Sequence, residues 1–585
     1  MHKCTEEIGM ASHRRRRNNR QKVFLIIAVV VLVVIIAGIT MLTTVIRRYS
    51  PSREMTDYSE FYGLEEGEVL LSFDNEILDE KGLYLDGEVY VSYNMLHTYL
   101  NERFYWDETE QILRYTLPEG NVSVASETAD YTVAKESETF DYTIVHMVDG
   151  EMYLSLSFAE KYTDIRWTFY EDPYRAVISD EWGDLEYVSV KQNTQVRELG
   201  GIKSDILTEL EKGSLVVILE ELDSWSRVCT EDGFVGYVRQ SALGDSCSQV
   251  YDSDFEEPEY EHITKEDTIC MAWHQVTNQS ANAAVSDVLS STKGINVISP
   301  TWFYLNDDEG GIASLASSDY VSTCHSQGVE VWALVSNLED SEVDTTKVLS
   351  VTSSRDALVN NLLSEAVKYD LDGINVDFES LEGEAGTGFL QFIRELSLKC
   401  ESNGIVLSVD NYPPASYNLF YSRDEQAVFA DYIVLMAYDE HYNGSEEGSV
   451  ASLSFVTQAV EDTLEEVPAE QIILGIPFYT RLWKLTPDEE AENGSYTISS
   501  EALGMSEAES RVAANGAVYE WLEDCGQYYA EYEYDGSTYK VWLEDQNSIA
   551  KKLDVMQSYS LAGASFWKLG YEKNTVWDTI AEYVE

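Results

Sequence analysis

From about residue 266 to the end of the chain, short apolar runs alternate with stretches in which apolar residues recur at helical spacing. The apolar runs cover residues 268–276, 295–303, 329–335, 373–379, 404–410, 432–438, 471–478 and 563–567. Helical spacing is evident at residues 356–369, 388–401 and 453–466. Eight buried parallel strands with crossover helices are the pattern of a (β/α)8 barrel. We therefore predict an α/β TIM barrel over residues 266–585, with an insertion at about 484–560.

A different pattern marks the N-terminal region. Residues 23–46 form an uncharged, apolar stretch of 24 residues, and roughly 20 apolar residues span a bilayer as a helix. A cleaved signal peptide would have a shorter apolar region and a small-residue cleavage site. Basic residues are denser before this stretch than after it, which places the N-terminus in the cytoplasm. We expect a cytoplasmic tail (1–22), a transmembrane signal anchor (23–46) and an extracytoplasmic remainder at the cell membrane.

Residues 55–185 read as short alternating strands and contain an internal repeat. Asp86-Gly-Glu-Val-Tyr-Val-Ser92 recurs as Asp149-Gly-Glu-Met-Tyr-Leu-Ser155, and Asp-Gly between alternating residues indicates a β-hairpin turn. The pattern resembles the duplicated N-terminal stalk domain of copper amine oxidases, without copper ligands. We expect a β-rich stalk that acts as a spacer or contacts the cell wall.

Residues 188–244 form a second small β unit. Its strands, with Trp225 and the segment Gly233-Phe-Val-Gly-Tyr-Val238, resemble a bacterial Src-homology-3-like domain, a small barrel that often binds cell-wall peptides or glycan. An acidic linker is expected at 245–265.

Composition and charge limit the classes of partner that the chain can bind. The formal net charge is −66, although residues 1–53 are basic, so the rest of the chain repels polyanions and nucleic-acid binding is excluded. The 39 Tyr and 12 Trp suit sugar rings but also fill cores. The histidines and cysteines lack zinc-type spacing, so neither a metal nor another cofactor is predicted. A disulfide between Cys229 and Cys247 is left open.

The run Asp372-Gly-Ile-Asn-Val-Asp-Phe-Glu379 carries the candidate chemistry. Alternate residues of a strand share a face, so Asn375, Asp377 and Glu379 should point into the barrel, while Ile374, Val376 and Phe378 pack against helices. Burying polar side chains costs several kcal/mol unless they are paired, and TIM barrels place their chemistry at strand ends. A functional site is therefore expected here, whereas Asp372 should serve the strand end structurally.

This run resembles the DGxDxDxE signature of glycoside hydrolase family 18. The similarity extends to Met436-Ala-Tyr-Asp439, to Leu474–Arg481 and to Ala564-Ser-Phe-Trp567. The family contains chitinases, endo-β-N-acetylglucosaminidases and spore peptidoglycan hydrolases. The residues of the motif are most similar to those of the branch that acts on bacterial cell walls and spore cortex.

The resemblance implies roles for individual residues. Members of the family retain anomeric configuration, and the 2-acetamido oxygen of the substrate attacks the anomeric carbon. Glu379 would be the general acid, Asp377 would accept the acetamido N–H and raise the pKa of Glu379, and Tyr438 would hold the acetamido oxygen. The remaining predicted substrate contacts are Asn375, Met436, Asp439, Trp567, Arg481 and Tyr479. Asn375 replaces the middle Asp of the signature and cannot take up a proton, which alters the expected rate or pH range.

The predicted function is hydrolysis of β-1,4 bonds next to N-acetylglucosamine, in peptidoglycan first and in chitin or N-glycans as alternatives. A non-catalytic glycan-binding protein on the same barrel is the alternative of another class, disfavoured because Glu379 is present. Further aromatic residues follow strand ends and serve either as sugar platforms or as packing: Trp302, Phe303, Tyr304, Tyr412, Tyr479 and Trp483.

Overall fold

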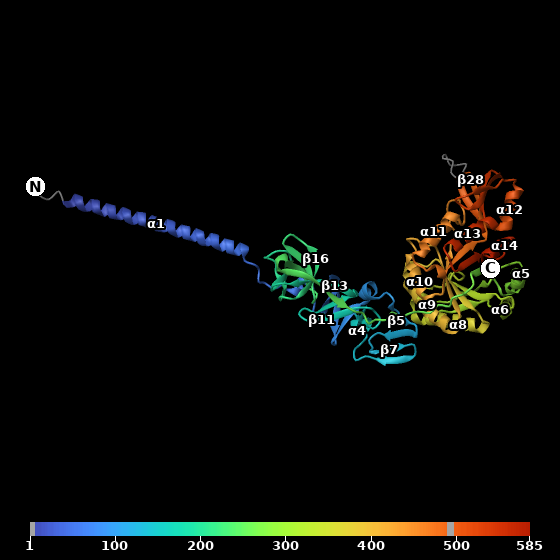
Figure 1. Cartoon of the computed structure of the whole chain (residues 1–585), viewed down its shortest axis with the longest axis horizontal. Helices are drawn as coiled ribbons and strands as arrows, with labels where there is room; N and C mark the ends of the chain where they lie inside the picture. The colour runs from blue at the N-terminus through green and yellow to red at the C-terminus, as the bar shows by residue number, and fades with distance from the viewer. Residues whose placement is uncertain (1–5, 488–495, 585) are drawn as a thin grey trace. The chain divides into compact units, whose positions relative to one another are not determined.

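The computed structural model describes residues 6–487 and 496–584 (Figure 1). By their internal contacts the residues fall into two compact units. The first unit comprises Met1–Asn101 and Val148–Glu256, and the second comprises Glu102–Met147 and Glu257–Glu585. Residues 55–185, expected as one stalk, therefore contribute strands to both units.

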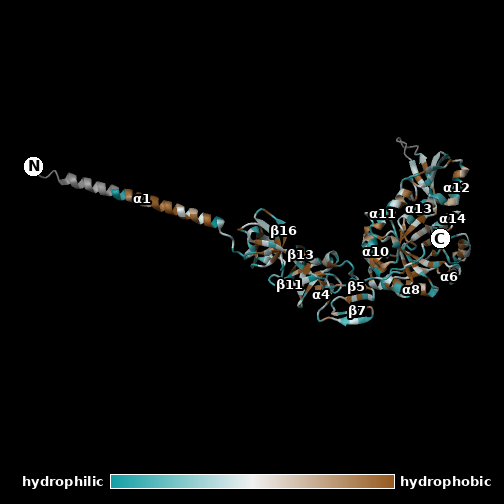
Figure 2. Ribbon diagram, in the orientation of Figure 1, coloured by the Kyte–Doolittle hydropathy of each residue, from teal (hydrophilic) through white to brown (hydrophobic). Residues whose placement is uncertain are grey.

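Helix α1 (Glu6–Tyr49) contains the apolar stretch. Its segment Arg20–Tyr49 is long and apolar enough to cross a membrane, and none of the most apolar part is buried against protein. Figure 2 shows this stretch as a continuous hydrophobic run. A helix with these properties is a membrane anchor or a signal sequence.

The sheet that holds the internal repeat lies in the first unit. Six of its seven strands are, in neighbour order, β11 (Arg166–Tyr170), β12 (Arg175–Ser179), β1 (Glu68–Phe73), β2 (Glu76–Leu85), β3 (Glu88–Ser92) and β10 (Glu151–Ser155), and β9 (Val145–Val148) is the seventh. The Asp86-Gly87 turn between β2 and β3 has φ of 51° and 97°, which confirms the predicted hairpin. The two copies of the repeat meet directly, because β3 and β10 pair antiparallel, with Leu154 opposite Val91.

A second sheet of the first unit follows in sequence. Its strands are β13 (Gly183–Val190), β14 (Thr194–Arg197), β15 (Ile206–Leu210), β16 (Leu215–Glu221), β17 (Trp225–Thr230), β18 (Val235–Arg239) and β19 (Leu243–Tyr251). Strand β19 continues into the stretch expected as linker, because it pairs along the whole of β13. Cys229, which is buried, and Cys247, which is exposed, are free thiols.

The second unit is built on a closed barrel of eight parallel strands, which confirms the predicted TIM barrel. The barrel strands are β20 (Ile269–His274), β21 (Val297–Leu305), β23 (Glu330–Ser336), β24 (Gly373–Asp377), β25 (Val406–Asn411), β26 (Tyr432–Met436), β27 (Ile472–Pro477) and β33 (Gly563–Trp567). Strand β20 pairs with both β21 and β33, which closes the ring. The surrounding helices are α5 (Val285–Ser290), α6 (Ser318–His325), α7 (Thr345–Ser350), α8 (Thr352–Tyr369), α9 (Gly386–Asn403), α10 (Arg423–Phe429), α11 (Leu453–Leu464), α13 (Gln546–Ser558) and α14 (Val576–Val584).

Strand β24 divides its residues as the alternation predicts. Ile374, Val376 and Phe378 belong to the core between strands and helices. The barrel interior is a separate apolar cluster that includes Trp273 and Trp332. A side chain at Gly373 would come within 2.6 Å of the Trp332 ring, so the absence of a Cβ there lets a large interior residue fit.

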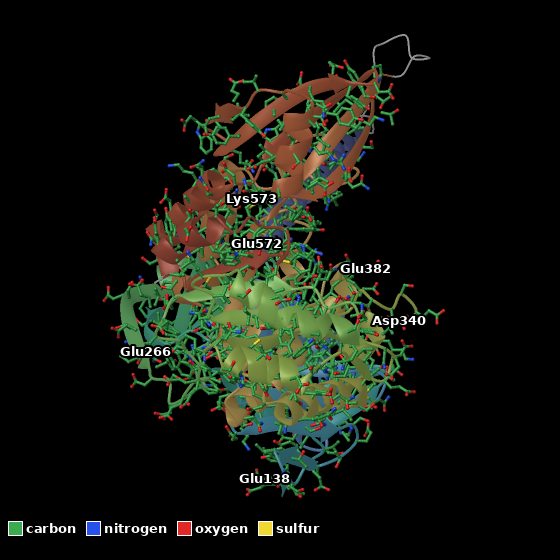
Figure 3. The ribbon with its side chains drawn as sticks, turned by 90° about the vertical axis from the view of Figure 1, so that its right-hand side faces the viewer. Glu138, Glu266, Asp340, Glu382, Glu572 and Lys573 are labelled. Carbon is green, nitrogen blue, oxygen red and sulfur yellow. The ribbon has the colours of Figure 1, made fainter. Side chains whose placement is uncertain are left out.

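The expected insertion follows the seventh barrel strand and forms a five-stranded sheet. It comprises β28 (Tyr479–Pro487), β29 (Tyr496–Gly504), α12 (Met505–Ala514), β30 (Glu520–Leu522), β31 (Gln527–Tyr534) and β32 (Ser537–Leu543). The insertion thus begins and ends earlier than the predicted 484–560, because α13 already belongs to the barrel. In Figure 3, Glu572 and Lys573, which follow β33, lie where the barrel meets this insertion, and Lys573 pairs with Glu509 of α12 at 2.7 Å.

A small sheet from residues 102–147 packs on the outside of the barrel, at the opposite end from the insertion, as the position of Glu138 in Figure 3 shows. Its strands are β4 (Tyr105–Asp107), β5 (Ile112–Leu117), β6 (Gly120–Ala125), β7 (Asp130–Val133) and β8 (Glu136–Thr139). Arg103 pairs with Glu425 at 2.9 Å, and the same carboxylate accepts from Arg394 of α9 at 2.6 Å. The Asp107 Oδ2 accepts a hydrogen bond from the Thr352 N–H at 2.6 Å.

This last bond caps a barrel helix from a distant part of the chain. Helix α8 has Val351 at its N-cap, which provides no side-chain acceptor, and Asp107 is only 1% exposed. We expect Asp107→Ala to lower the free energy of unfolding of the second unit by about 1 kcal/mol, the usual cost of losing an N-cap acceptor. Denaturant unfolding of the full chain, followed by the fluorescence of the buried barrel tryptophans, measures it.

The neighbouring Glu108, which is exposed, provides the matched control. Glu108→Ala should leave the transition within about 0.5 kcal/mol of the wild type, as is usual for surface substitutions. Equal effects of the two substitutions would show that the cap contributes nothing.

Candidate active site

The candidate site lies at the C-terminal ends of the barrel strands, where TIM barrels carry their chemistry. Strand β24 brings Asn375 and Asp377 and is followed by Glu379. Its neighbour β25 brings Asp410 and is followed by Tyr412. The other predicted site residues stand after β26, in β28 and at the end of β33: Tyr438, Asp439, Tyr479, Arg481 and Trp567.

Asn375 is fully buried and uses every polar atom of its side chain. Its Oδ1 accepts hydrogen bonds from the Trp273 Nε1–H at 3.0 Å and the Ser299 hydroxyl at 3.1 Å. Its Nδ2 donates to the Ser408 hydroxyl at 3.1 Å and to the Asp410 Oδ1 at 2.7 Å. The amide therefore ties β24 to β20, β21 and β25, and these contacts place Asn375 inside the barrel as predicted.

Asp377 lies two residues further along the same face and is 9% exposed. Among the residues that the structure describes, no hydrogen-bond partner reaches its buried Oδ1. Burial raises the pKa of Asp377 well above its usual range, and the neighbouring Asp410, Glu379 and Glu339 raise it further. An acceptor held in this way is open to a donor from outside the protein.

Glu379 follows the strand and is held near its neighbour Tyr412. The Tyr412 hydroxyl donates to the Glu379 Oε2 at 2.6 Å. Burial raises the pKa of Glu379; the bond from Tyr412 opposes this rise, and the charges of Asp439 and Glu339 add to it. The raised pKa agrees with the expectation, but its main cause is burial rather than the charge of Asp377.

The backbone of Glu379 is fixed by Asn337, which follows β23. The Asn337 Nδ2 donates to the Glu379 carbonyl at 3.0 Å, and the Glu379 N–H donates to the Asn337 Oδ1 at 2.9 Å. One residue earlier, the Tyr421 hydroxyl donates to the carbonyl of Phe378 at 3.1 Å. The backbone that presents the Glu379 carboxyl is therefore held from two neighbouring connections.

A second group of predicted residues gathers on the other side of the site. The Tyr438 ring lies 6.4 Å from the Tyr479 ring, edge to face, and the Tyr479 hydroxyl donates to the Asp439 Oδ1 at 2.6 Å. Arg481 lies 3.9 Å from the same Asp439 oxygen. Burial raises the pKa of the Tyr438 hydroxyl, and the charges of Asp410, Asp377 and Glu379 raise it further, so Tyr438 lies near the carboxyls.

The remaining predicted contacts and aromatic candidates differ in how deeply they are buried. Trp567 is half-buried, and its ring lies 5.7 Å from the Trp273 ring, edge to face; Met436 is buried. Trp302, Phe303 and Trp483 are at most 1% exposed, so they are packing residues rather than sugar platforms. Tyr412, considered as a platform, instead donates to the candidate acid.

Sequence reasoning missed Asp410 and Asn337. Asp410 stands at the end of a run interpreted as a buried strand, and its alternation with Ser408 could have placed both inward. Asn337 lies in a connection, where no periodicity applies. Asp372 behaves as predicted, since its Oδ2 accepts from the Val331 N–H at 2.8 Å and contacts His325. No group of side chains able to hold a metal ion occurs within residues 6–487 and 496–584.

A (β/α)8 barrel with two carboxyl groups on one inward-facing strand end, both with a pKa raised by burial, has the features of a glycoside hydrolase. Comparison with known proteins agrees. Residues 261–572 match the family model "Glycosyl hydrolases family 18", and the chain belongs to this family of glycosidases.

Two curated relatives are bacterial. "Putative sporulation-specific glycosylase YdhD" of Bacillus subtilis is 26% identical over 268 residues, covering 44% of this chain and 62% of the relative. The match therefore spans less than two thirds of that protein. "Cortical fragment-lytic enzyme" of Bacillus anthracis is 24% identical over 308 residues, covering 50% of this chain and 70% of the relative.

One solved structure supports the fold alone. The C-terminal domain of a putative chitinase from Desulfitobacterium hafniense aligns with a TM-score of 0.50 and 18% identity. The alignment covers 55% of this chain and 100% of that domain.

The backbone clamp on Glu379 leads to a prediction. We expect Asn337→Ala to leave the N–H and carbonyl of Glu379 unpaired, costing about 1–3 kcal/mol of stability, and to speed hydrogen exchange at the Glu379 amide. Exchange followed by mass spectrometry on peptides that contain residue 379 measures this effect.

Asn361 provides the comparison, because its Nδ2 donates to the Gly310 carbonyl at 3.0 Å, away from the carboxyls. Asn361→Ala should leave exchange at Glu379 unchanged. Unchanged exchange in Asn337→Ala would mean that the clamp does not hold this backbone.

Proposed function

We propose that the protein hydrolyses β-1,4 bonds next to N-acetylglucosamine in peptidoglycan, with retention of configuration, by using the acetamido group of the substrate as nucleophile. The observation that carries the proposal is the pair formed by Asp377 and Glu379. Asp377 offers a buried oxygen that has no hydrogen-bond partner among the described residues, and Glu379 has a raised pKa. The first suits an acceptor for an acetamido N–H and the second suits a general acid.

The reaction divides between these residues. Glu379 donates its proton to the glycosidic oxygen while the acetamido oxygen attacks the anomeric carbon, and Glu379 then activates the water that opens the oxazolinium. Asp377, as an anion, accepts the acetamido N–H and stabilises the positive charge of the oxazolinium. The Tyr438 hydroxyl donates a hydrogen bond to the acetamido oxygen, and the Trp567 ring lies under the sugar.

The remaining residues of the site bind and orient the sugar. Met436 borders the acetamido group, while Asp439, Tyr479 and Arg481 form a linked set that faces sugar hydroxyls. Asn375 holds the strand end that presents Asp377, because its amide bonds to three other strands.

Peptidoglycan is favoured over chitin and N-glycans by the named activity of one relative and by the parts of the chain outside the barrel. The Bacillus anthracis relative is named a cortical fragment-lytic enzyme. The apolar helix α1 suits an uncleaved anchor with a cytoplasmic N-terminus, and an anchor of this kind supports a substrate in the cell wall. The sheet of residues 183–251 fits the Src-homology-3-like resemblance, and the sheet with the repeat fits a stalk.

Replacement of the acid tests the proposal directly. We expect the full chain to release reducing ends from purified peptidoglycan and Glu379→Gln to lower this rate by about 10²–10⁴-fold, the contribution of a general acid. Mass spectrometry of the products, with chitin oligomers and a glycoprotein run in parallel, identifies the preferred polymer. Retention of glycan without any release by the unaltered protein would instead support the non-catalytic alternative.

The bond from Tyr412 sets a pH prediction. A donor to the charged carboxylate lowers the pKa of Glu379, so Tyr412→Phe should raise that pKa further. The acid then keeps its proton to higher pH, and the alkaline limb of kcat/KM should move up by about one pH unit or less. The pH profile on a soluble N-acetylglucosamine oligomer measures the shift.

Tyr421 offers a matched control, because its hydroxyl donates to the Phe378 carbonyl rather than to the acid. Tyr421→Phe should leave the alkaline limb in place. A shift of the limb to lower pH in Tyr412→Phe would contradict the assigned role of the bond.

A further inference from the structure

A third buried carboxyl completes the cluster. Strands β24 and β25 are parallel and in register, with Asn375 opposite Ser408 and Val376 opposite Val409. One step further, Asp377 and Asp410 occupy corresponding positions on neighbouring strands and face the barrel interior. Asp410 is 3% exposed and Asp377 is 9% exposed. The charge of Asp410 adds to burial in raising the pKa of Asp377, and this arrangement favours a single proton held by the pair.

The two carboxyls differ in their hydrogen bonds. Asp410 accepts from the Asn375 Nδ2 at 2.7 Å, which stabilises its charged form, whereas the Asp377 Oδ1 has no partner among the described residues. Donors to a carboxylate favour ionisation. In the free site this difference favours the negative charge on Asp410 and the proton on Asp377.

Substrate reverses this preference. The acetamido N–H supplies the donor that Asp377 lacks, and the oxazolinium needs an anion beside it. Burial is the largest cause of the raised pKa of Asp377, so Asp377 would stay protonated if no other base were near. The proton of Asp377 needs an acceptor within the site.

We propose that Asp410 is that acceptor: it takes the proton of Asp377 as substrate binds, and so supplies from β25 the carboxyl that Asn375 lacks on β24. The O–H bond of Asp377 breaks and an O–H bond forms on Asp410, so the net charge of the pair does not change. The negative charge moves from Asp410 to Asp377, next to the reacting sugar. Asp410 is a positioning residue for charge, and the inference rests on the proposed retaining hydrolysis.

Three titratable groups face Asp410. Asp377 and Glu379 interact with Asp410 electrostatically, and the charge of Asp410 raises the pKa of the Tyr438 hydroxyl. All three are acids, and Asn375 donates the neutral hydrogen bond. A proton is therefore the only positive charge that these neighbours offer to the cluster.

The kinetic test moves the carboxyl between strands. In Asp410→Asn the proton of Asp377 has no acceptor, so kcat on an N-acetylglucosamine oligomer should fall by at least about tenfold. The double variant Asn375→Asp/Asp410→Asn returns the third carboxyl on β24 and should recover most of this loss. A kcat of Asp410→Asn within about threefold of the wild type, or a folded double variant no faster than Asp410→Asn, overturns the proposal.

A stability measurement tests whether the pKa of Asp410 is raised in the folded chain, and it does not require activity. Burial raises the pKa of Asp410 in the folded chain. Between the pKa of the unfolded chain and that of the folded chain, mainly the unfolded chain ionises, so the stability of the fold decreases as pH rises. Asp410→Asn lacks this loss. The Tm of the full-chain variant minus that of the wild type should grow from pH 4 to pH 7.

Ser408→Ala is the control, because it removes the other acceptor of the Asn375 Nδ2 and leaves all carboxyls in place. Its Tm difference from the wild type should not vary with pH. An equally flat difference for Asp410→Asn would mean that the pKa of Asp410 is the same in the folded and unfolded chains, so that the pair holds no proton, and would overturn the proposal. Absence of hydrolysis by the wild type would contradict the proposed function instead, and the Tm comparison would still decide whether the buried pair holds a proton.

Discussion

The side-chain amide of Asn375 is the constraint on which the rest of the site depends. It is fully buried and makes four hydrogen bonds, two as acceptor and two as donor, to residues of β20, β21 and β25. An amide can do this because it carries a donor and an acceptor group side by side. An ionised carboxylate at the same place would only accept, and both Ser408 and Asp410 would lose their donor.

The chemistry of the site follows from how unevenly its carboxyls are satisfied. Asp410 accepts a hydrogen bond from the Asn375 amide and Glu379 accepts one from Tyr412, whereas the Asp377 Oδ1 has no partner within the part of the chain that the structure describes. Burial acts on all three and penalises their charged forms. The result is a cluster in which the donor that reaches each carboxyl sets how readily it ionises.

Much of this architecture could be predicted from sequence. Eight apolar runs with helices between them are a long and regular signal, and the period of two in β24 correctly separated Asn375 from Ile374 and Val376. The exchange of Asp for Asn within the motif was also visible. The consequence of this exchange could not be predicted, because Asp410, the carboxyl that accepts a hydrogen bond from Asn375, lies on another strand, within a run that resembled buried core.

Other features could not be predicted for related reasons. Asn337 acts through a connection that has no periodic pattern, and the hydroxyl of Tyr412 could be assigned only once its distance to Glu379 was known. Trp302 and Trp483 could be either sugar platforms or packing residues by sequence, because sequence does not reveal burial at a strand end. The sheet of residues 102–147 belongs to the second unit through pairings between residues far apart in sequence, which local propensity does not encode.

Those pairings also set an order of assembly. Arg103 and Arg114 reach partners 322 and 242 residues later in the chain. During synthesis, the small sheet emerges well before the helices that it contacts, so its docking surface stays open while the intervening sheets form. Contacts of such long sequence separation close late and slow folding. The contacting surface of this early sheet is therefore open to chaperones or proteases until residues 356 and 425 have been synthesised.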